Sequence, residues 1–172
     1  PSSSSGDKDF ISVNAGLTYT QELWSADLRG ESLWGGSEDK RGIQAGLYRQ
    51  QTPGLGMASI FEYWSRDALN GTSSVDCSVE FSLAYRPIYS QLILLEKLKY
   101  SFNEQQGGSA DTTQYKLVNN LNANYLFDRS NQLAVHSGLK HIRDNFNSGA
   151  YSNLLMTVGV EYRHDISHLW GW

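Results

Sequence analysis

The stretch Ser74–Arg86 reads SVDCSVEFSLAYR and alternates apolar residues with polar or small ones along its length. Successive side chains of a β-strand point to opposite faces, so this period of two predicts a strand with one apolar and one polar face. The apolar set comprises Val75, Cys77, Val79, Phe81, Leu83 and Tyr85, and the residues between them form the polar set.

The same period recurs along nearly the whole chain and predicts nine strands. They lie at roughly 10–20, 23–34, 41–51, 55–66, 74–86, 91–103, 113–127, 131–143 and 150–163, and a tenth is expected to begin near His168. The alternation is weakest in 41–51 and 55–66. Leucines in 89–100 also fit helical spacing, but strands on both sides and hairpin-length connections favour a strand there. The predicted fold class is all-β, an antiparallel up-and-down meander of nine to ten strands.

Composition narrows the class of protein. The chain has 172 residues, a net charge of −4 and 12% aromatic residues, which indicates a folded chain and argues against a nucleic-acid groove. Its one cysteine, Cys77, rules out an internal disulfide or a cysteine cluster. The longest apolar runs, such as Leu92–Leu95, are too short for a transmembrane helix. These observations do not exclude a membrane β-barrel. Its strands alternate apolar and polar residues, so its mean hydropathy resembles that of a soluble protein.

The predicted connections alternate in length. Short ones alternate with longer Gly/Ser/Asp-rich loops at 35–40, 67–73, 104–112 and 144–149. Tight periplasmic turns and longer outer loops are typical of outer-membrane barrels. Strands of about ten to fourteen residues exceed the usual soluble length and suit a tilted span of a bilayer. The meander is therefore expected to be part or all of a transmembrane outer-membrane β-barrel.

Aromatic residues flank the predicted turns and loops. Amphipathic rings are favoured at the membrane–water boundary, so girdles are expected at both rims of a barrel. Cross-strand aromatic pairing in a soluble sheet is the alternative. The residues concerned are Tyr19, Trp24, Trp34, Tyr63, Trp64, Tyr85, Tyr89, Tyr100, Tyr125, Phe127, Tyr151 and Tyr162.

Three runs carry a resemblance to a known group of proteins. They are SLAYRPIYSQLILLEKLKYSF (82–102), LNANYLFDRSNQLAVHSGLKHI (121–142) and LLMTVGVEYRHDISHLWGW (154–172). Over roughly residues 75–172 the chain resembles, in style, the C-terminal β-barrel segment of large, poorly characterised bacterial outer-membrane proteins. Strands in that group end in Tyr-Arg-Pro or similar, as at Tyr85–Pro87 and Tyr162–His164. The resemblance implies fold and location, and it carries over no functional residue.

The domain expected is a single β-barrel, or a fragment of one, over residues 1–172. The first strand runs into a short turn, so residues 1–9 are expected to be a flexible outer loop or terminus. The strand expected near His168 breaks off at Trp172, and there is no initiator Met or signal peptide. We expect a fragment of a larger barrel, with a mature chain after signal removal as the alternative.

The polar face carries charges of both signs. In a barrel this face points into the lumen, where charges either line a wet pore or pair across strands to fill a narrow interior. In a soluble sandwich the same charges would face solvent. The lumen-facing candidates are Asp27, Arg29, Glu31, Glu80, Lys99, Lys116, His136, Lys140, Glu161 and Arg163.

The sequence offers no convergent catalytic set. His136 and His141 differ by five positions and so face opposite sides of a strand, as do His136 and Ser137. We predict no catalytic, cofactor-binding or metal-binding residue, no cofactor and no enzymatic activity. Cys77 is expected to be an inert thiol on the lipid face. Glu96 falls on the apolar parity, which points to a β-bulge, a contact with another protein, or an incorrect strand assignment.

The function expected is a non-catalytic bacterial outer-membrane barrel that serves as a membrane anchor, channel or conduit wall. A soluble antiparallel sandwich or barrel that acts as a binding module, and an outer-membrane hydrolase, are the alternatives. The expected partners are membrane lipids, both lipopolysaccharide and phospholipid, with other subunits or missing parts of the same barrel as further candidates. No nucleic-acid partner is expected.

Overall fold

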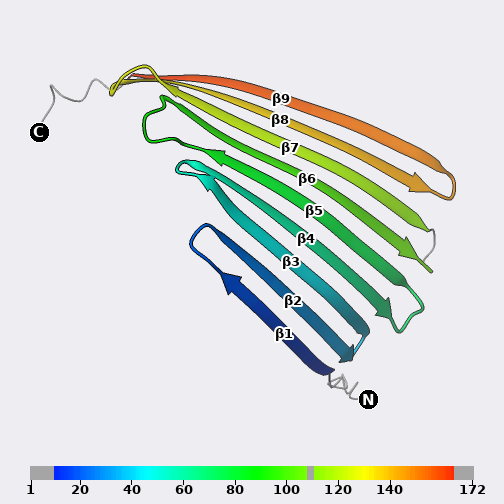
Figure 1. Cartoon of the computed structure of the whole chain (residues 1–172). Coiled ribbons are helices and arrows are strands. Elements are labelled where there is room, and N and C mark those ends of the chain that lie inside the picture. The colour runs from blue at the N-terminus through cyan, green and yellow to red at the C-terminus, as the bar shows by residue number, and fades with distance from the viewer. Residues whose placement is uncertain (1–9, 108–110, 165–172) are drawn as a thin grey trace, which may run out of the picture.

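The computed structural model describes residues 10–107 and 111–164 and contains nine β-strands and no helix within them (Figure 1). The predictions for residues 1–9 and for a strand near His168 lie outside the described residues. No helix in the described part of the chain is long and apolar enough to span a membrane. The strands are β1 (Phe10–Thr20), β2 (Trp24–Gly35), β3 (Glu38–Thr52), β4 (Leu55–Ala68), β5 (Ser73–Tyr85), β6 (Leu92–Gln106), β7 (Thr112–Leu126), β8 (Asn131–Phe146) and β9 (Gly149–His164).

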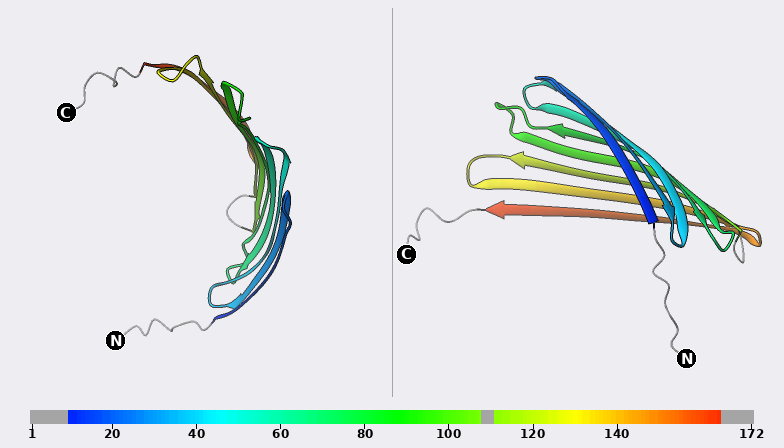
Figure 2. Two further views of the ribbon diagram at one scale, coloured as in Figure 1. Left: turned by 60° about the vertical axis from the view of Figure 1, so that its left-hand side comes forward. Right: turned by 90° about the horizontal axis from the view of Figure 1, so that it is seen from below.

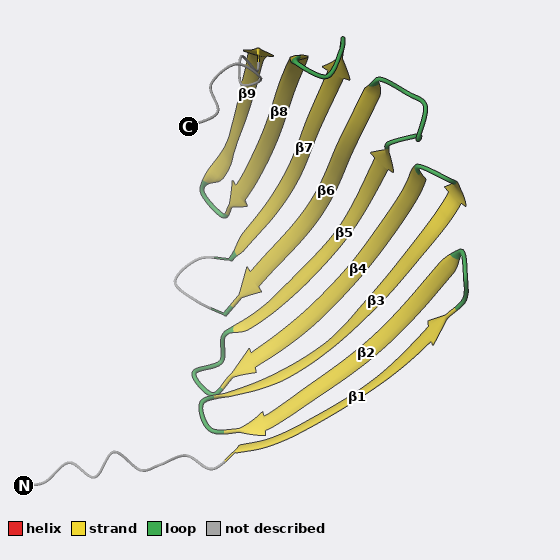
Figure 3. Ribbon diagram, turned by 90° about the vertical axis from the view of Figure 1, so that its left-hand side faces the viewer, coloured by secondary structure: helices red, strands yellow, loops and turns green. Residues whose placement is uncertain are grey.

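All nine strands form one antiparallel sheet in which spatial order follows chain order (Figures 1 and 3). The predicted all-β up-and-down meander is therefore confirmed. The helical alternative over residues 89–100 is wrong, because β6 pairs with both β5 and β7 along its length. The sheet is open, since no pairing joins β1 to β9.

The strands run further into the predicted long loops than expected. Residues Glu104–Gln106 were predicted to lie in a loop, but they pair with Ser73–Val75 of β5. The connection between β2 and β3 is likewise shorter than predicted and consists of Gly36–Ser37. The predicted alternation of short and long connections is therefore wrong. Polar residues at these strand ends continue the hydrogen-bonded ladder. They do not alternate with apolar residues, so the sequence pattern did not predict a strand there.

The register is continuous, so parity assigns every side chain to a face. The strand pairs show one register shift among the described residues, between Gln50 and Thr52 at the end of β3. In-register partners share a face of the sheet. The apolar face of β5 therefore continues onto every other strand.

The sheet is curved into an arc (Figure 2). The exposures of neighbouring residues on β5 indicate that the polar face is the concave one. On the apolar face of β5, Val79 and Phe81 are 44% and 39% exposed. Between them, Glu80 on the polar face exposes only 15% of its side chain. Side chains crowd together on the inside of a curved sheet and spread apart on the outside.

This single layer has almost no core of its own. Ala134 is the one buried hydrophobic residue in the described part of the chain. Globular domains bury their apolar faces between two or more layers. The convex face here has no such second layer, although it carries most of the large apolar side chains.

Candidate functional site

The structure brings all ten predicted lumen-facing residues to the concave polar face. On β5 to β8, for example, Glu80, Lys99, Val118 and Lys140 follow one another as in-register partners. By register these ten residues share one face of the sheet. That this face lines a lumen stays a prediction.

Glu62 on β4 is the centre of a polar network on this face. Its Oε1 accepts a hydrogen bond from Gln44 Nε2 on β3 at 3.2 Å, and its Oε2 accepts one from Ser78 Oγ on β5 at 3.1 Å. Lys99 Nζ on β6 lies 3.9 Å from the same Oε2. One carboxylate thus connects side chains from four neighbouring strands.

Two further ion pairs join neighbouring strands. Lys97 Nζ lies 2.7 Å from Glu80 Oε1, and Arg66 lies 3.5 Å from Asp76, which also accepts a hydrogen bond from Asn103 Nδ2. The partly exposed pairs contribute only ~0–1 kcal/mol each. The pairs mainly set which charges of the concave face are already neutralised.

Trp64 was predicted to belong to an aromatic girdle, but it lies on the concave polar face. Its ring covers the Cα of Gly42, its in-register partner, and leaves no room for a Cβ there. Lys40 Nζ lies 4.0 Å from the ring centroid, within range of a cation–π interaction. The sequence alone could have placed Trp64 on the polar face, because Trp64 shares parity with Glu62 and Arg66. Tyr151 on β9 shares this polar face by register and is likewise no part of a convex girdle.

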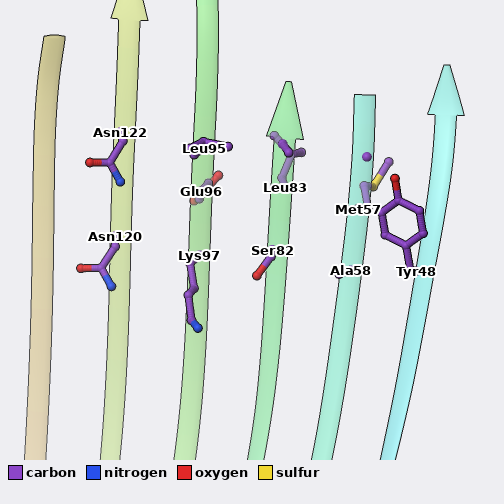
Figure 4. Close-up of a pocket in the computed structure, with 12 residues that line it drawn as sticks. Tyr48, Met57, Ala58, Ser82, Leu83, Leu95, Glu96, Lys97, Asn120 and Asn122 are labelled. Carbon is purple, nitrogen blue, oxygen red and sulfur yellow. The ribbon is translucent and has the colours of Figure 1, made fainter. Parts of the chain in front are cut away.

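A hollow of about 330 Å³ lies on the concave side of β3 to β7 (Figure 4). Its lining mixes apolar and polar side chains, from Tyr48 on β3 through Ser82 and Leu95 to Asn120 and Asn122 on β7. The hollow is open rather than enclosed by a second layer. Glu96 and Lys97 also border it, but as successive residues of β6 they point to opposite faces of the sheet.

The convex face carries two rows of aromatic residues, one near each end of the strands. Three ring pairs reinforce them, with centroids 5.1 Å apart for Tyr19 and Trp24, 5.0 Å for Tyr125 and Phe127, and 5.3 Å for Phe102 and Tyr115. The first row contains Trp24, Tyr85, Tyr125 and Tyr162, and the second contains Trp34, Tyr63, Phe102 and Tyr115.

Glu96 lies on the convex apolar face with Asn119 as its partner. Asn119 Nδ2 donates a hydrogen bond to Glu96 Oε1 at 3.1 Å. The register runs without a shift through Glu96 on both sides, so the predicted bulge and the incorrect-strand alternative are both wrong. Contact with another protein at this position stays a prediction.

The histidines have separate partners. His136 on the concave face lies 3.0 Å from Asn122 Oδ1 through Nδ1 and 4.0 Å from Glu161 through Nε2. His141 contacts Ser152 Oγ at 3.0 Å on the convex face. No group of three or more His, Cys, Asp or Glu that could hold a metal ion occurs in residues 10–107 and 111–164. Cys77 lies on the convex face as a free thiol.

Neither a known protein-family model nor a curated protein matches this chain.

Proposed function

We propose that this chain forms part or all of the wall of a transmembrane β-barrel in a bacterial outer membrane. It serves there as an anchor, channel or conduit wall and carries out no catalysis. The observation that carries the proposal is the convex apolar face bounded by two aromatic rows. Membrane lipids, lipopolysaccharide and phospholipid, are the proposed partners of this face.

The spacing of the rows supports a bilayer as the environment. Trp24 and Trp34 are ten residues apart on β2, and Tyr115 and Tyr125 are ten apart on β7. Ten residues span about 33 Å along a strand at ~3.3 Å each. Tilted by about 30–40°, this length covers about 25–29 Å, close to the apolar band of an outer-membrane barrel.

The stagger of the rows gives the tilt independently. Following in-register partners from Trp24 across five strand spacings leads to Leu121 on β7, four residues short of Tyr125. Four residues are about 13 Å along the strand, and five spacings are about 24 Å across it. A row that is level with the membrane therefore implies strands tilted by about 30°, near the usual range for barrels.

The exposed apolar area is the energetic argument for lipid. A soluble sheet of this size hides such a face against a second layer, and an exposed patch this large promotes association in water. Between the rows, Val158 and Val160 are 72% and 68% exposed. Lipid chains cover these side chains without a second protein layer.

The first test uses lipid-borne quenchers. Variants that retain a single tryptophan at position 24, 34 or 64 are folded into phosphatidylcholine–phosphatidylglycerol vesicles that carry brominated acyl chains. We expect quenching of Trp24 and Trp34 and little quenching of Trp64, because Trp64 lies on the opposite face. A protein that is monodisperse without detergent and is not quenched would contradict the proposal.

Planar-bilayer recording then separates channel from anchor. A discrete and reproducible conductance supports a channel, and a silent but inserted barrel with heat-modifiable migration on denaturing gels supports an anchor. Hydrolytic activity that is lost in the variant His136→Ala would contradict the proposal that the chain carries out no catalysis.

A further inference from the structure

Within β2 to β8, the two halves β2–β5 and β6–β8 of the concave face differ in charge, and β9 adds one charge of each sign, Glu161 and Arg163. On β2 to β5 six carboxylates accompany three cations, and on β6 to β8 four lysines accompany one carboxylate. The first half carries Asp27, Glu31, Glu38, Glu62, Asp76 and Glu80 with Arg29, Lys40 and Arg66, and the second carries Lys97, Lys99, Lys116 and Lys140 with Asp144.

Three of these lysines surround one residue at the centre of β7. Val118 has Lys99 of β6 and Lys140 of β8 as its two in-register partners. Lys116 lies two positions along β7 on the same face, diagonal to both. Diagonal neighbours on adjacent strands are within reach of long side chains. We call Lys99, Lys116 and Lys140 the lysine cluster.

The cluster is incompletely neutralised. Lys99 has Glu62 at 3.9 Å, whereas no carboxylate of the described residues forms an ion pair with Lys116 or Lys140. The concave row of β7 supplies no acid either, since Lys116 is followed by Asn120, Asn122 and Asn124. Like charges on neighbouring strands destabilise a sheet. An external anion would remove that repulsion.

A hollow beside the cluster has room for such an anion. Its volume is about 470 Å³, and Lys99 and Lys116 line it together with Ser101, Asn103 and Gln114. Hydroxyl and amide groups next to ammonium groups supply the donors that phosphate and carboxylate oxygens accept. Glu62 and Asp76 close its other side. Both acids already have partners of their own on neighbouring strands.

We infer that the lysine cluster is a binding site for small anions with phosphate or carboxylate oxygens, and that it gives this wall a preference for anionic solutes. The site deepens the proposed function. Only the preference for anionic solutes rests on that function, because a wall selects among solutes only if its concave face lines a wet interior. Lys99 and Lys116 contact the anion in the hollow that they line, and Lys140, on the far side of Val118, adds a positive charge nearby.

The test measures binding of inorganic pyrophosphate to the full chain folded in detergent, by titration calorimetry. We expect the affinity to fall about tenfold or more in the double variant Lys116→Gln/Lys140→Gln, since one charge-assisted contact and one nearby positive charge are lost. Lys40→Gln is the matched control, because Lys40 lies on the same face but over the Trp64 ring. Affinity should also fall steeply as salt concentration rises.

Absence of pyrophosphate binding to the wild-type chain, or an equal loss of affinity in Lys40→Gln, would overturn the site. Bromolipid quenching of Trp24 is measured on the same protein preparation folded into vesicles and reports membrane insertion separately. If the chain binds pyrophosphate but does not insert into vesicles, the membrane proposal is refuted and the site is retained. If it inserts but does not bind pyrophosphate, the site is refuted and the membrane proposal is retained. If the wild-type chain conducts ions, the reversal potential in a KCl gradient should show a higher ratio of cation to anion permeability for the double variant than for the wild type.

Discussion

Asn119 on β7 donates a hydrogen bond to Glu96 on β6, and the two form a polar pair on a face that is otherwise apolar. Both lie close to the middle of the band between the aromatic rows, since Asn119 is one residue from the midpoint of Tyr115 and Tyr125. A carboxylate facing lipid there is costly unless it is paired.

The single variant Asn119→Leu should therefore lower the unfolding free energy in vesicles, by about 1–3 kcal/mol, because it leaves the carboxylate without its donor. The double variant Glu96→Leu/Asn119→Leu should recover this loss or exceed the wild type. Urea unfolding of the wild type, the two single variants Glu96→Leu and Asn119→Leu and the double variant in vesicles measures the cycle. Additive losses in the double variant would mean that the two residues act separately, and that this patch contacts something other than lipid.

An arginine on the convex face of β9 should be costly. Val158→Arg is expected to destabilise the inserted protein by about 2–4 kcal/mol, since Val158 lies near the middle of the apolar band. The neighbouring substitution Thr157→Arg is the control, because its side chain points to the concave face. Heat-modifiable migration and urea unfolding provide the measurement. Equal tolerance of both substitutions would contradict the assignment of the two faces.

The contact between Gly42 and Trp64 predicts a position-specific effect of alanine. A Cβ at Gly42 would overlap the indole ring, whereas the nearest atom to a Cβ at Gly30 is 3.9 Å away. Gly42→Ala should displace the ring from Lys40 and cost about 1–3 kcal/mol of unfolding free energy. Gly30→Ala should be close to neutral. Tryptophan emission of a variant that retains only Trp64 would report the displacement, and an unchanged spectrum would exclude it.

Asp128 organises the turn between β7 and β8. The side-chain amide of Asn131 and the backbone N–H groups of Ser130 and Asn131 all donate to its carboxylate, which lowers the pKa of Asp128 below its ordinary value. A lowered folded-state pKa adds stability above the unfolded-state pKa and loses it as pH falls through the folded value. Asp128→Ala should therefore speed amide exchange at Ser130 and Asn131 near neutral pH.

In the wild type the same protection should decline only in acid, below the ordinary titration range of aspartate. NMR in detergent micelles can follow both amides and the carboxyl carbon of Asp128. A carboxyl that titrates at its ordinary pKa, or exchange rates that do not respond to the substitution, would show that the turn closes without it.

Local periodicity was enough to predict the strand order and the facing of side chains. The alternation in Ser74–Arg86 reappears as β5 almost residue for residue. Even the weakly patterned strands β3 and β4 form, because pairing on both sides compensates for their poor alternation. Strand ends were missed where the residues are polar on both faces, as in Glu104–Gln106, since hydropathy there has no period to detect.

Contacts that depend on register were beyond sequence reasoning. Parity identified Glu96 as an exception on the apolar face, but only the alignment of β6 against β7 makes Asn119 its diagonal neighbour. The lysine cluster has the same origin. Lys99, Lys116 and Lys140 are far apart in the chain, and three aligned strands are needed to bring them around Val118.

The neighbour-by-neighbour strand order has a consequence for the order of folding. Each strand contacts only the strands before and after it in the described chain, so no pairing waits for distant segments to meet. Short loop closures are entropically cheap, and folds built from them form without a long search. The sheet can therefore grow one hairpin at a time, and each completed strand becomes the template for the next. What a cell must shield during assembly is then an advancing edge of unpaired backbone rather than a collapsed apolar intermediate.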